Sequence, residues 1–128
     1  MIKSLLKKHP YKLAFLWAML IFGLCSMPGK YIPTASWLEL LSFDKWVHAG
    51  IFFVLVSLSC LGVIIHQQPS YLVTVFFFLS VLYGGLLEIM QAKVFSQRSA
   101  DWQDFVANSF GCLMALLFHK KIIKIVFK

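Results

Sequence analysis

Four long apolar runs constrain this chain more than any other feature of its sequence. They cover about residues 13–27, 46–65, 71–90 and 101–119, and short polar segments with prolines or charged residues separate them. A helix needs about 20 mainly apolar residues to cross the hydrocarbon core of a bilayer. The runs therefore predict four membrane-spanning helices, of which the first is the shortest.

Composition favours a membrane protein over a soluble domain. The chain has 128 residues, of which 60% are hydrophobic and 13% charged, whereas a soluble domain is about 45–50% apolar and about 25% charged. So short a chain cannot bury this apolar excess in one core of its own. We therefore expect an all-α polytopic membrane protein, with one domain over residues 1–128 and four helices in a compact bundle.

The net charge of +7 points to membrane lipids rather than nucleic acid as the partner. A nucleic-acid binder gathers Lys and Arg on one polar face, but here they flank the apolar runs. Eight of the 12 Lys and Arg residues lie near the two termini: Lys3, Lys7, Lys8, Lys12, Lys120, Lys121, Lys124 and Lys128. Because cytoplasmic segments carry the excess of basic residues, both termini should be cytoplasmic, which an even number of spans allows.

The three cysteines, Cys25, Cys60 and Cys112, lie within apolar runs and form no CxxC or Cys/His motif. We interpret them as small buried apolar residues. A disulfide or a reactive thiol stays open as the alternative.

Polar residues gather on the outer side of the predicted bundle. They open the second helix (Asp44, Lys45, His48), close the third (Glu88, Gln91) and lead into the fourth (Arg98, Asp101, Asp104, Asn108). Spacings of three, four and seven residues put each group on one stripe of its helix. Asn108 would lie about 10 Å deeper than Asp101 at a rise of 1.5 Å per residue, where facing lipid is costly. We therefore expect the three stripes to face one another.

Two structural interpretations of these residues stay open. Asp44 and Asp101 are typical of helix N-caps, and Asp104 gains from the dipole of a first turn. Neither effect explains Glu88, which lies near a helix C-terminus. Alternatively, the carboxylates could pair with Lys45 and Arg98 in a network that only ties the helices together. Because the carboxylates outnumber those two cations, the cluster could also exchange protons or bind cations.

Each residue type suggests a role. Glu88 or Asp101 with His48 could exchange protons, so these three are the catalytic candidates. The candidates for binding or orienting a substrate are Asp44, Lys45, Gln91, Arg98, Asp104 and Asn108. No compact metal motif such as HExxH is present, so we predict no metal site, although carboxylates with His48 leave a divalent cation open. The sequence specifies no cofactor.

The ordered set of polar residues resembles the VanZ-like family of bacterial membrane proteins. The resemblance covers about residues 17–117 and rests on Asp44, Lys45, His48, Glu88, Gln91, Arg98, Asp101, Asp104, Asn108 and Gly111. It implies a multi-pass protein of four helices in the bacterial cytoplasmic (inner) membrane. The family takes its name from an accessory factor in resistance to the glycopeptide antibiotic teicoplanin, and such resistance is not assumed for this chain.

These observations predict an envelope protein whose outer cluster binds, or as an enzyme modifies, a lipid-linked or cell-wall-related molecule. A small oligomeric transporter or channel is one alternative, but a transported solute needs polar groups near the midplane. There the chain offers mainly Ser57, Ser59, Thr74 and Ser80. The other alternative is a non-catalytic membrane assembly protein. The oligomeric state does not follow from the sequence.

Overall fold

The computed structural model describes residues 1–26, 43–93 and 102–127, and every regular element in these ranges is an α-helix. In chain order the helices are α1 (Ile2–Lys8), α2 (Pro10–Ser26), α4 (Phe43–Ile65), α5 (Tyr71–Lys93) and α6 (Trp102–Val126). The prediction of an all-α fold is confirmed.

Four of these helices correspond to the four predicted apolar runs, with different ends. α2 begins at Pro10 rather than at 13, because proline suits the first turn of a helix, where its missing N–H is not needed. α4 and α5 extend past their apolar runs, to Phe43 and Lys93. α6 continues to Val126 instead of ending at 119. Lysine has nearly the same helix propensity as leucine, so the basic residues after 119 do not end the helix. The predicted ends at 27 and 101 lie outside the described residues.

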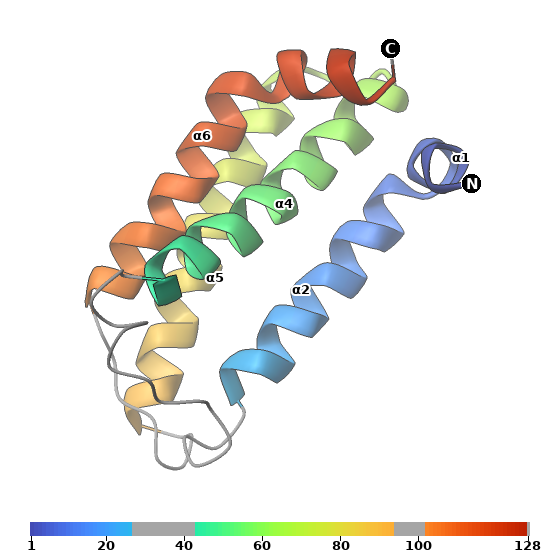
Figure 1. Cartoon of the computed structure of the whole chain (residues 1–128). Coiled ribbons are helices and arrows are strands. Elements are labelled where there is room, and N and C mark those ends of the chain that lie inside the picture. The colour runs from blue at the N-terminus through green and yellow to red at the C-terminus, as the bar shows by residue number, and fades with distance from the viewer. Residues whose placement is uncertain (27–42, 94–101, 128) are drawn as a thin grey trace.

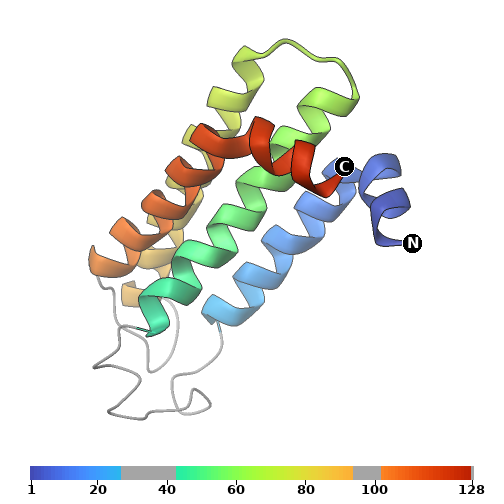
Figure 2. The same ribbon diagram turned by 45° about the horizontal axis from the view of Figure 1, so that its top comes forward.

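A short helix, α1, precedes the first apolar run and was not predicted. Its backbone pattern stops at His9 (φ −136°, ψ 52°), because the residue before a proline is disfavoured in the helical region. α1 therefore lies at an angle to α2, as Figures 1 and 2 show.

The long helices form a bundle in which α4 packs against α2, α5 and α6 (Figure 1). α4 and α5 form an antiparallel pair, joined by a tight turn in which Gln67 has a positive φ of 52° and ends the helix. Both termini lie at one end of the bundle (Figure 2). At the other end, α4 and α6 begin and α2 and α5 finish.

The core forms along one stripe of α4. Phe52, Val56, Cys60 and Val63 recur at helical spacing and are all buried. The other helices contribute Ile21, Val73, Leu87, Cys112 and Ala115 to the same core. Cys60 and Cys112 are buried free thiols, as predicted, whereas the side chain of Cys25 lies outside the described part of the chain.

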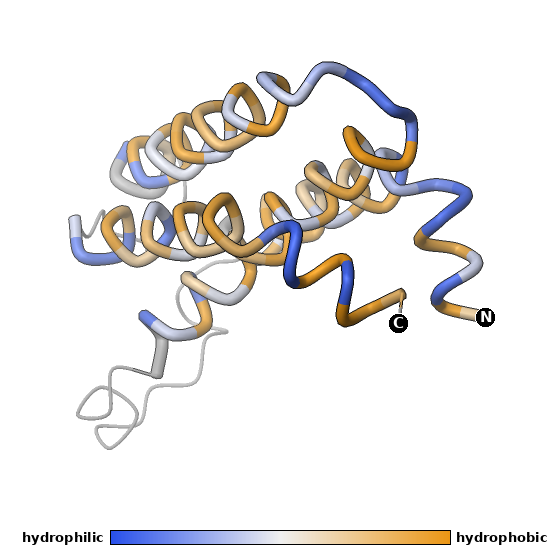
Figure 3. Tube along the Cα trace, turned by 90° about the horizontal axis from the view of Figure 1, so that it is seen from above, coloured by the Kyte–Doolittle hydropathy of each residue, from blue (hydrophilic) through white to orange (hydrophobic). Residues whose placement is uncertain are grey.

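Apolar side chains also cover the outside of the bundle. Fully or partly exposed examples are Phe15, Leu16 and Met19 on α2, Phe78, Leu82 and Ile89 on α5, and Val106, Phe110 and Leu117 on α6. Within the described ranges, the segments Lys45–Ile65 and Tyr71–Met90 are long and apolar enough to cross a bilayer. Figure 3 shows hydrophobic residues along the helices and hydrophilic residues towards their ends. This distribution supports association with a membrane.

Candidate functional site

Two polar contacts join α4 to α6 near the start of both helices. Lys45 Nζ donates to Asp104 Oδ1 at 2.6 Å, and His48 Nδ1 lies 3.1 Å from Asn108 Oδ1. Lys45 and His48 share a face of α4 at a spacing of three residues, and Asp104 and Asn108 share a face of α6 at four. Because both helices run in the same direction, the second contact lies one turn deeper than the first.

The two contacts are linked by the imidazole and by a third helix. His48 Nε2 lies 3.6 Å from Asp104 Oδ2, which is longer than a good hydrogen bond. Glu88 enters from α5, and one donor atom each of His48, Glu88 and Asp104 lie within 4.8 Å of one another. We call Lys45, His48, Glu88, Asp104 and Asn108 the polar cluster.

Burial increases through the cluster. The side chains of Lys45, His48 and Asp104 are 22%, 16% and 14% exposed, whereas Glu88 is 7% and Asn108 2% exposed. Buried carboxylates and amides are costly unless they are paired. The cluster is thus open to solvent at its rim and enclosed at its base.

Close contact between helices makes this geometry possible. A Cβ built on Gly111 would overlap the backbone carbonyl of Ala49. Gly111 lies about one helical turn after Asn108, and Ala49 directly follows His48. A Cβ on Gly84 would lie 3.2 Å from Asn108 Nδ2. Glycine at these two positions lets α6 pack closely against α4 and α5.

Five of the nine predicted site residues therefore meet in the structure. The remaining four are not placed: Arg98 and Asp101 lie outside the described residues, and the side chains of Asp44 and Gln91 are not described although their backbones belong to α4 and α5. The catalytic or binding roles assigned to all nine stay predictions.

Contacts that hold α2 were missed by sequence reasoning. Trp17 Nε1 donates to the carbonyl of Ile51 at 2.8 Å, and the Tyr83 hydroxyl donates to the carbonyl of Ala18 at 2.6 Å. Both acceptors are backbone carbonyls inside helices, so no residue type in the sequence marks them. These bonds attach α2 to α4 and α5.

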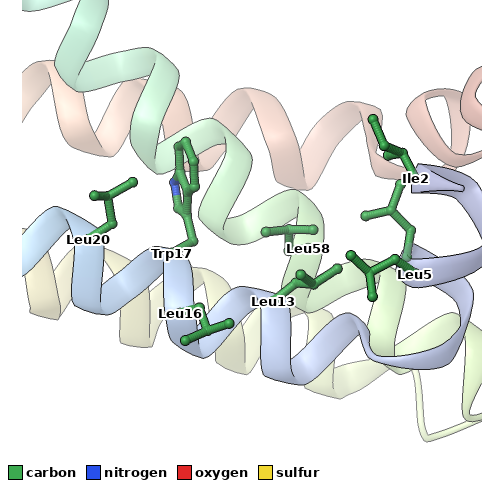
Figure 4. Close-up of a pocket in the computed structure, with 8 residues that line it drawn as sticks. Ile2, Leu5, Leu13, Leu16, Trp17, Leu20 and Leu58 are labelled. Carbon is green, nitrogen blue, oxygen red and sulfur yellow. The ribbon is translucent and has the colours of Figure 1, made fainter.

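A hydrophobic cleft of about 340 Å³ lies away from the polar cluster, between α1, α2 and α4 (Figure 4). Its walls are leucines and Ile2 around the indole of Trp17. None of its lining side chains is ionisable, and the indole N–H is already bonded to Ile51. The cleft can take an apolar chain but offers no group for acid–base chemistry.

The donor set of the cluster suits a cation. An imidazole nitrogen and two carboxylates are the ligands that divalent transition metals take in proteins, and His48, Glu88 and Asp104 supply them from three helices. These three residues form no compact sequence motif because they lie far apart along the chain.

No model of a known protein family, no curated protein and no solved structure matches this chain. Membership of the VanZ-like family therefore stays a prediction, and the function is argued from the fold and the polar cluster.

Proposed function

We propose that this chain is a VanZ-like multi-pass protein of the bacterial cytoplasmic membrane whose polar cluster binds the headgroup of a lipid-linked envelope molecule at the outer face. The observation that carries this proposal is the convergence of five polar side chains from three helices at the end of the bundle opposite to the termini. Binding is the minimum claim, and proton exchange by His48 and Glu88 would make the site catalytic.

We assign α2, α4, α5 and α6 to the membrane. α4 and α5 contain the two segments that are long and apolar enough to span it, and α2 holds a shorter apolar segment, Pro10–Leu24. α6 is more polar, but Asn108 is buried and Asp104 faces α4, while Val106, Phe110 and Leu117 form an exposed apolar stripe. A helix with its polar groups turned inward can lie in lipid.

The basic residues support the orientation. Lys3, Lys7 and Lys8 on α1 and Lys120 and Lys121 on α6 are exposed at the end of the bundle that holds both termini. The positive-inside rule puts that end in the cytoplasm. The polar cluster then lies at the outer face of the membrane.

The chemistry of the cluster fits a polar headgroup on an apolar tail. Lys45, with Arg98 from the sequence, offers cationic donors for phosphate, and the carboxylates of Glu88 and Asp104 accept hydrogen bonds from hydroxyl or amine groups. The exposed apolar sides of the helices provide a surface for the tail. A molecule anchored in the bilayer reaches such a site without leaving the membrane.

Binding and turnover by the purified chain test this proposal. Wild type, Glu88→Gln and Asp104→Asn are reconstituted in lipid nanodiscs and exposed to a panel of lipid-linked envelope precursors, with monodispersity as the check on folding. We expect wild type to retain at least one precursor, and both variants to remain folded while binding it at least tenfold more weakly or losing turnover.

The same experiment separates the non-catalytic assembly protein. If wild type neither binds nor converts any precursor, and both variants aggregate, then the cluster serves to hold the helices together. That result would overturn the proposed function.

A further inference from the structure

Among the described side chains of the polar cluster, the carboxylates outnumber the ammonium groups. Glu88 and Asp104 bring two carboxylates, whereas Lys45 brings one ammonium group, which already contacts Asp104 at 2.6 Å. A phosphate group bound by Lys45 would lie beside the Asp104 carboxylate. A cation within the cluster would remove the repulsion between these two groups.

The orientation of His48 leaves one ring nitrogen directed at the carboxylates. A neutral imidazole that donates from Nδ1 to Asn108 Oδ1, at 3.1 Å, carries its lone pair on Nε2. Nε2 in turn lies 3.6 Å from Asp104 Oδ2, a gap too long for a good hydrogen bond. In this tautomer the Nε2 lone pair faces a carboxylate oxygen. A metal ion between the two atoms satisfies both.

The separation of these atoms fits a shared metal ion. Two ligands at bond lengths of about 2.1 Å around a tetrahedral ion lie roughly 3.4 Å apart, and the Nε2–Oδ2 distance is 3.6 Å. Glu88 supplies the third donor, within 4.8 Å of the other two.

Asp104 and His48 each have one polar atom bonded to a neighbouring side chain and one left for a metal ion. Lys45 binds Asp104 Oδ1, which leaves Oδ2 for a metal, and Asn108 binds the other nitrogen of His48. Partners of this kind fix the tautomer and the direction of metal ligands. Lys45 and Asn108 would therefore hold Asp104 and His48 in place for a metal ion.

We propose that His48 Nε2, a Glu88 carboxylate oxygen and Asp104 Oδ2 bind one divalent transition-metal ion, with Asn108 and Lys45 as positioning residues. One nitrogen and two oxygen donors favour zinc or manganese over calcium or magnesium. Three protein ligands leave at least one coordination position for water or for a headgroup oxygen. In this last respect the inference deepens the proposed function and rests on it.

Metal uptake by tag-free protein tests the site without reference to any lipid. Wild type is stripped with a chelator, dialysed against Zn²⁺, Mn²⁺ or Co²⁺, and analysed for metal per chain, with the visible absorption of Co²⁺ as a report on its ligands. We expect about one ion per chain. His48→Gln and Asp104→Asn should weaken binding at least tenfold, and Asn108→Ala by about 10- to 100-fold.

The matched control is His119→Gln. This histidine lies on α6 at the opposite end of the bundle, where its Nδ1 contacts the carbonyl of Leu116, so its loss should leave uptake and the Co²⁺ spectrum unchanged. Stripped wild type that takes up no metal would overturn the inference, as would folded His48→Gln and Asp104→Asn proteins with wild-type uptake.

A lipid-binding measurement distinguishes failure of the metal site from failure of the proposed function. Binding of a long-chain isoprenoid phosphate is measured with stripped and with metal-loaded protein. We expect metal to strengthen it at least tenfold. Metal uptake at His48 without any lipid binding would leave the metal site standing and remove the proposed function. Lipid binding by a protein that takes up no metal would leave the proposed function standing and remove the metal site.

Discussion

Asn108 is the residue on which the base of the polar cluster depends. It is 2% exposed, and its side-chain oxygen lies 3.1 Å from His48 Nδ1. Its neighbour Ser109 has a buried hydroxyl with no hydrogen-bond partner among the described residues. The two adjacent positions on α6 therefore make a matched pair for mutation.

We expect Asn108→Ala to lower the free energy of unfolding by about 1–3 kcal/mol, because it removes a buried amide and the partner of a partly buried imidazole nitrogen. Ser109→Ala should change stability by less than about 0.5 kcal/mol or raise it slightly, since it removes an unsatisfied polar group. Denaturant titration in a mild detergent measures both. A larger loss for Ser109→Ala than for Asn108→Ala would show that the burial or the pairing described here is wrong.

At the residue scale, the sequence predicted which residues belong to the polar cluster better than it predicted which of them contact each other. The stripes on each helix follow from spacing alone, so the approach of Lys45, His48 and Asn108 was predictable in outline. Which partner each residue meets depends on how far one helix is shifted along another, and side-chain packing sets that shift. The contact of Lys45 with Asp104 thus required the structure.

At the scale of elements, the contact of α4 with α6 sets the geometry of the cluster. The two backbones approach so closely at Gly111 that a side-chain carbon there would overlap the carbonyl of Ala49. Gly50, the next residue of α4, is exposed, and a Cβ there would meet nothing within 4 Å.

Gly111→Ala should therefore destabilise the chain by about 1–3 kcal/mol, because backbone atoms must move to admit the methyl group. Gly50→Ala should be neutral or stabilising by up to about 1 kcal/mol, since alanine favours the helix. Thermal unfolding followed by circular dichroism in detergent compares the two variants. Equal stability of Gly111→Ala and wild type would contradict the close packing of α4 on α6.

Helix ends were harder to predict than helices. Hydropathy marks the apolar centre of a segment, so it located α4 and α5 well but missed the basic last turns of α6. In Figures 1 and 2 these turns run across the end of the bundle. They combine Lys120, Lys121 and Lys124 with isoleucines, a composition that suits a helix lying at the membrane surface. α1 has the same character, and Lys7 lies over the ring of Phe127 at 5.2 Å.

At the scale of the whole molecule, the proposed function requires the two ends of the bundle to face opposite sides of a membrane. In a chain without its native cysteines, a cysteine replacing exposed Trp102 at the start of α6 should react with a membrane-impermeant maleimide in spheroplasts. A cysteine replacing exposed Ser70, between α4 and α5, should react only after lysis. Labelling of both positions, or the reverse order, would contradict the proposed orientation.

At this scale the prediction of an all-α fold is confirmed. It followed from long apolar runs in a short chain, because such runs favour packed helices. The arrangement of the helices in the bundle was harder to predict from the sequence. α4 lies at the centre because Phe52, Val56 and Cys60 pack against several neighbouring helices. Nothing in the periodicity of one helix specifies how many partners it has.

The proposal that the polar cluster is a ligand site is best tested by lipid binding. A long-chain isoprenoid phosphate is bound to wild type, Lys45→Gln and Lys93→Gln in nanodiscs, and the three affinities are compared. Lys45 lies within the cluster, whereas Lys93 is an exposed lysine at the end of α5, so both variants remove one charge from the same end of the bundle. We expect at least tenfold weaker binding by folded Lys45→Gln and near wild-type binding by Lys93→Gln. Equal binding by all three proteins, or none by wild type, would contradict it.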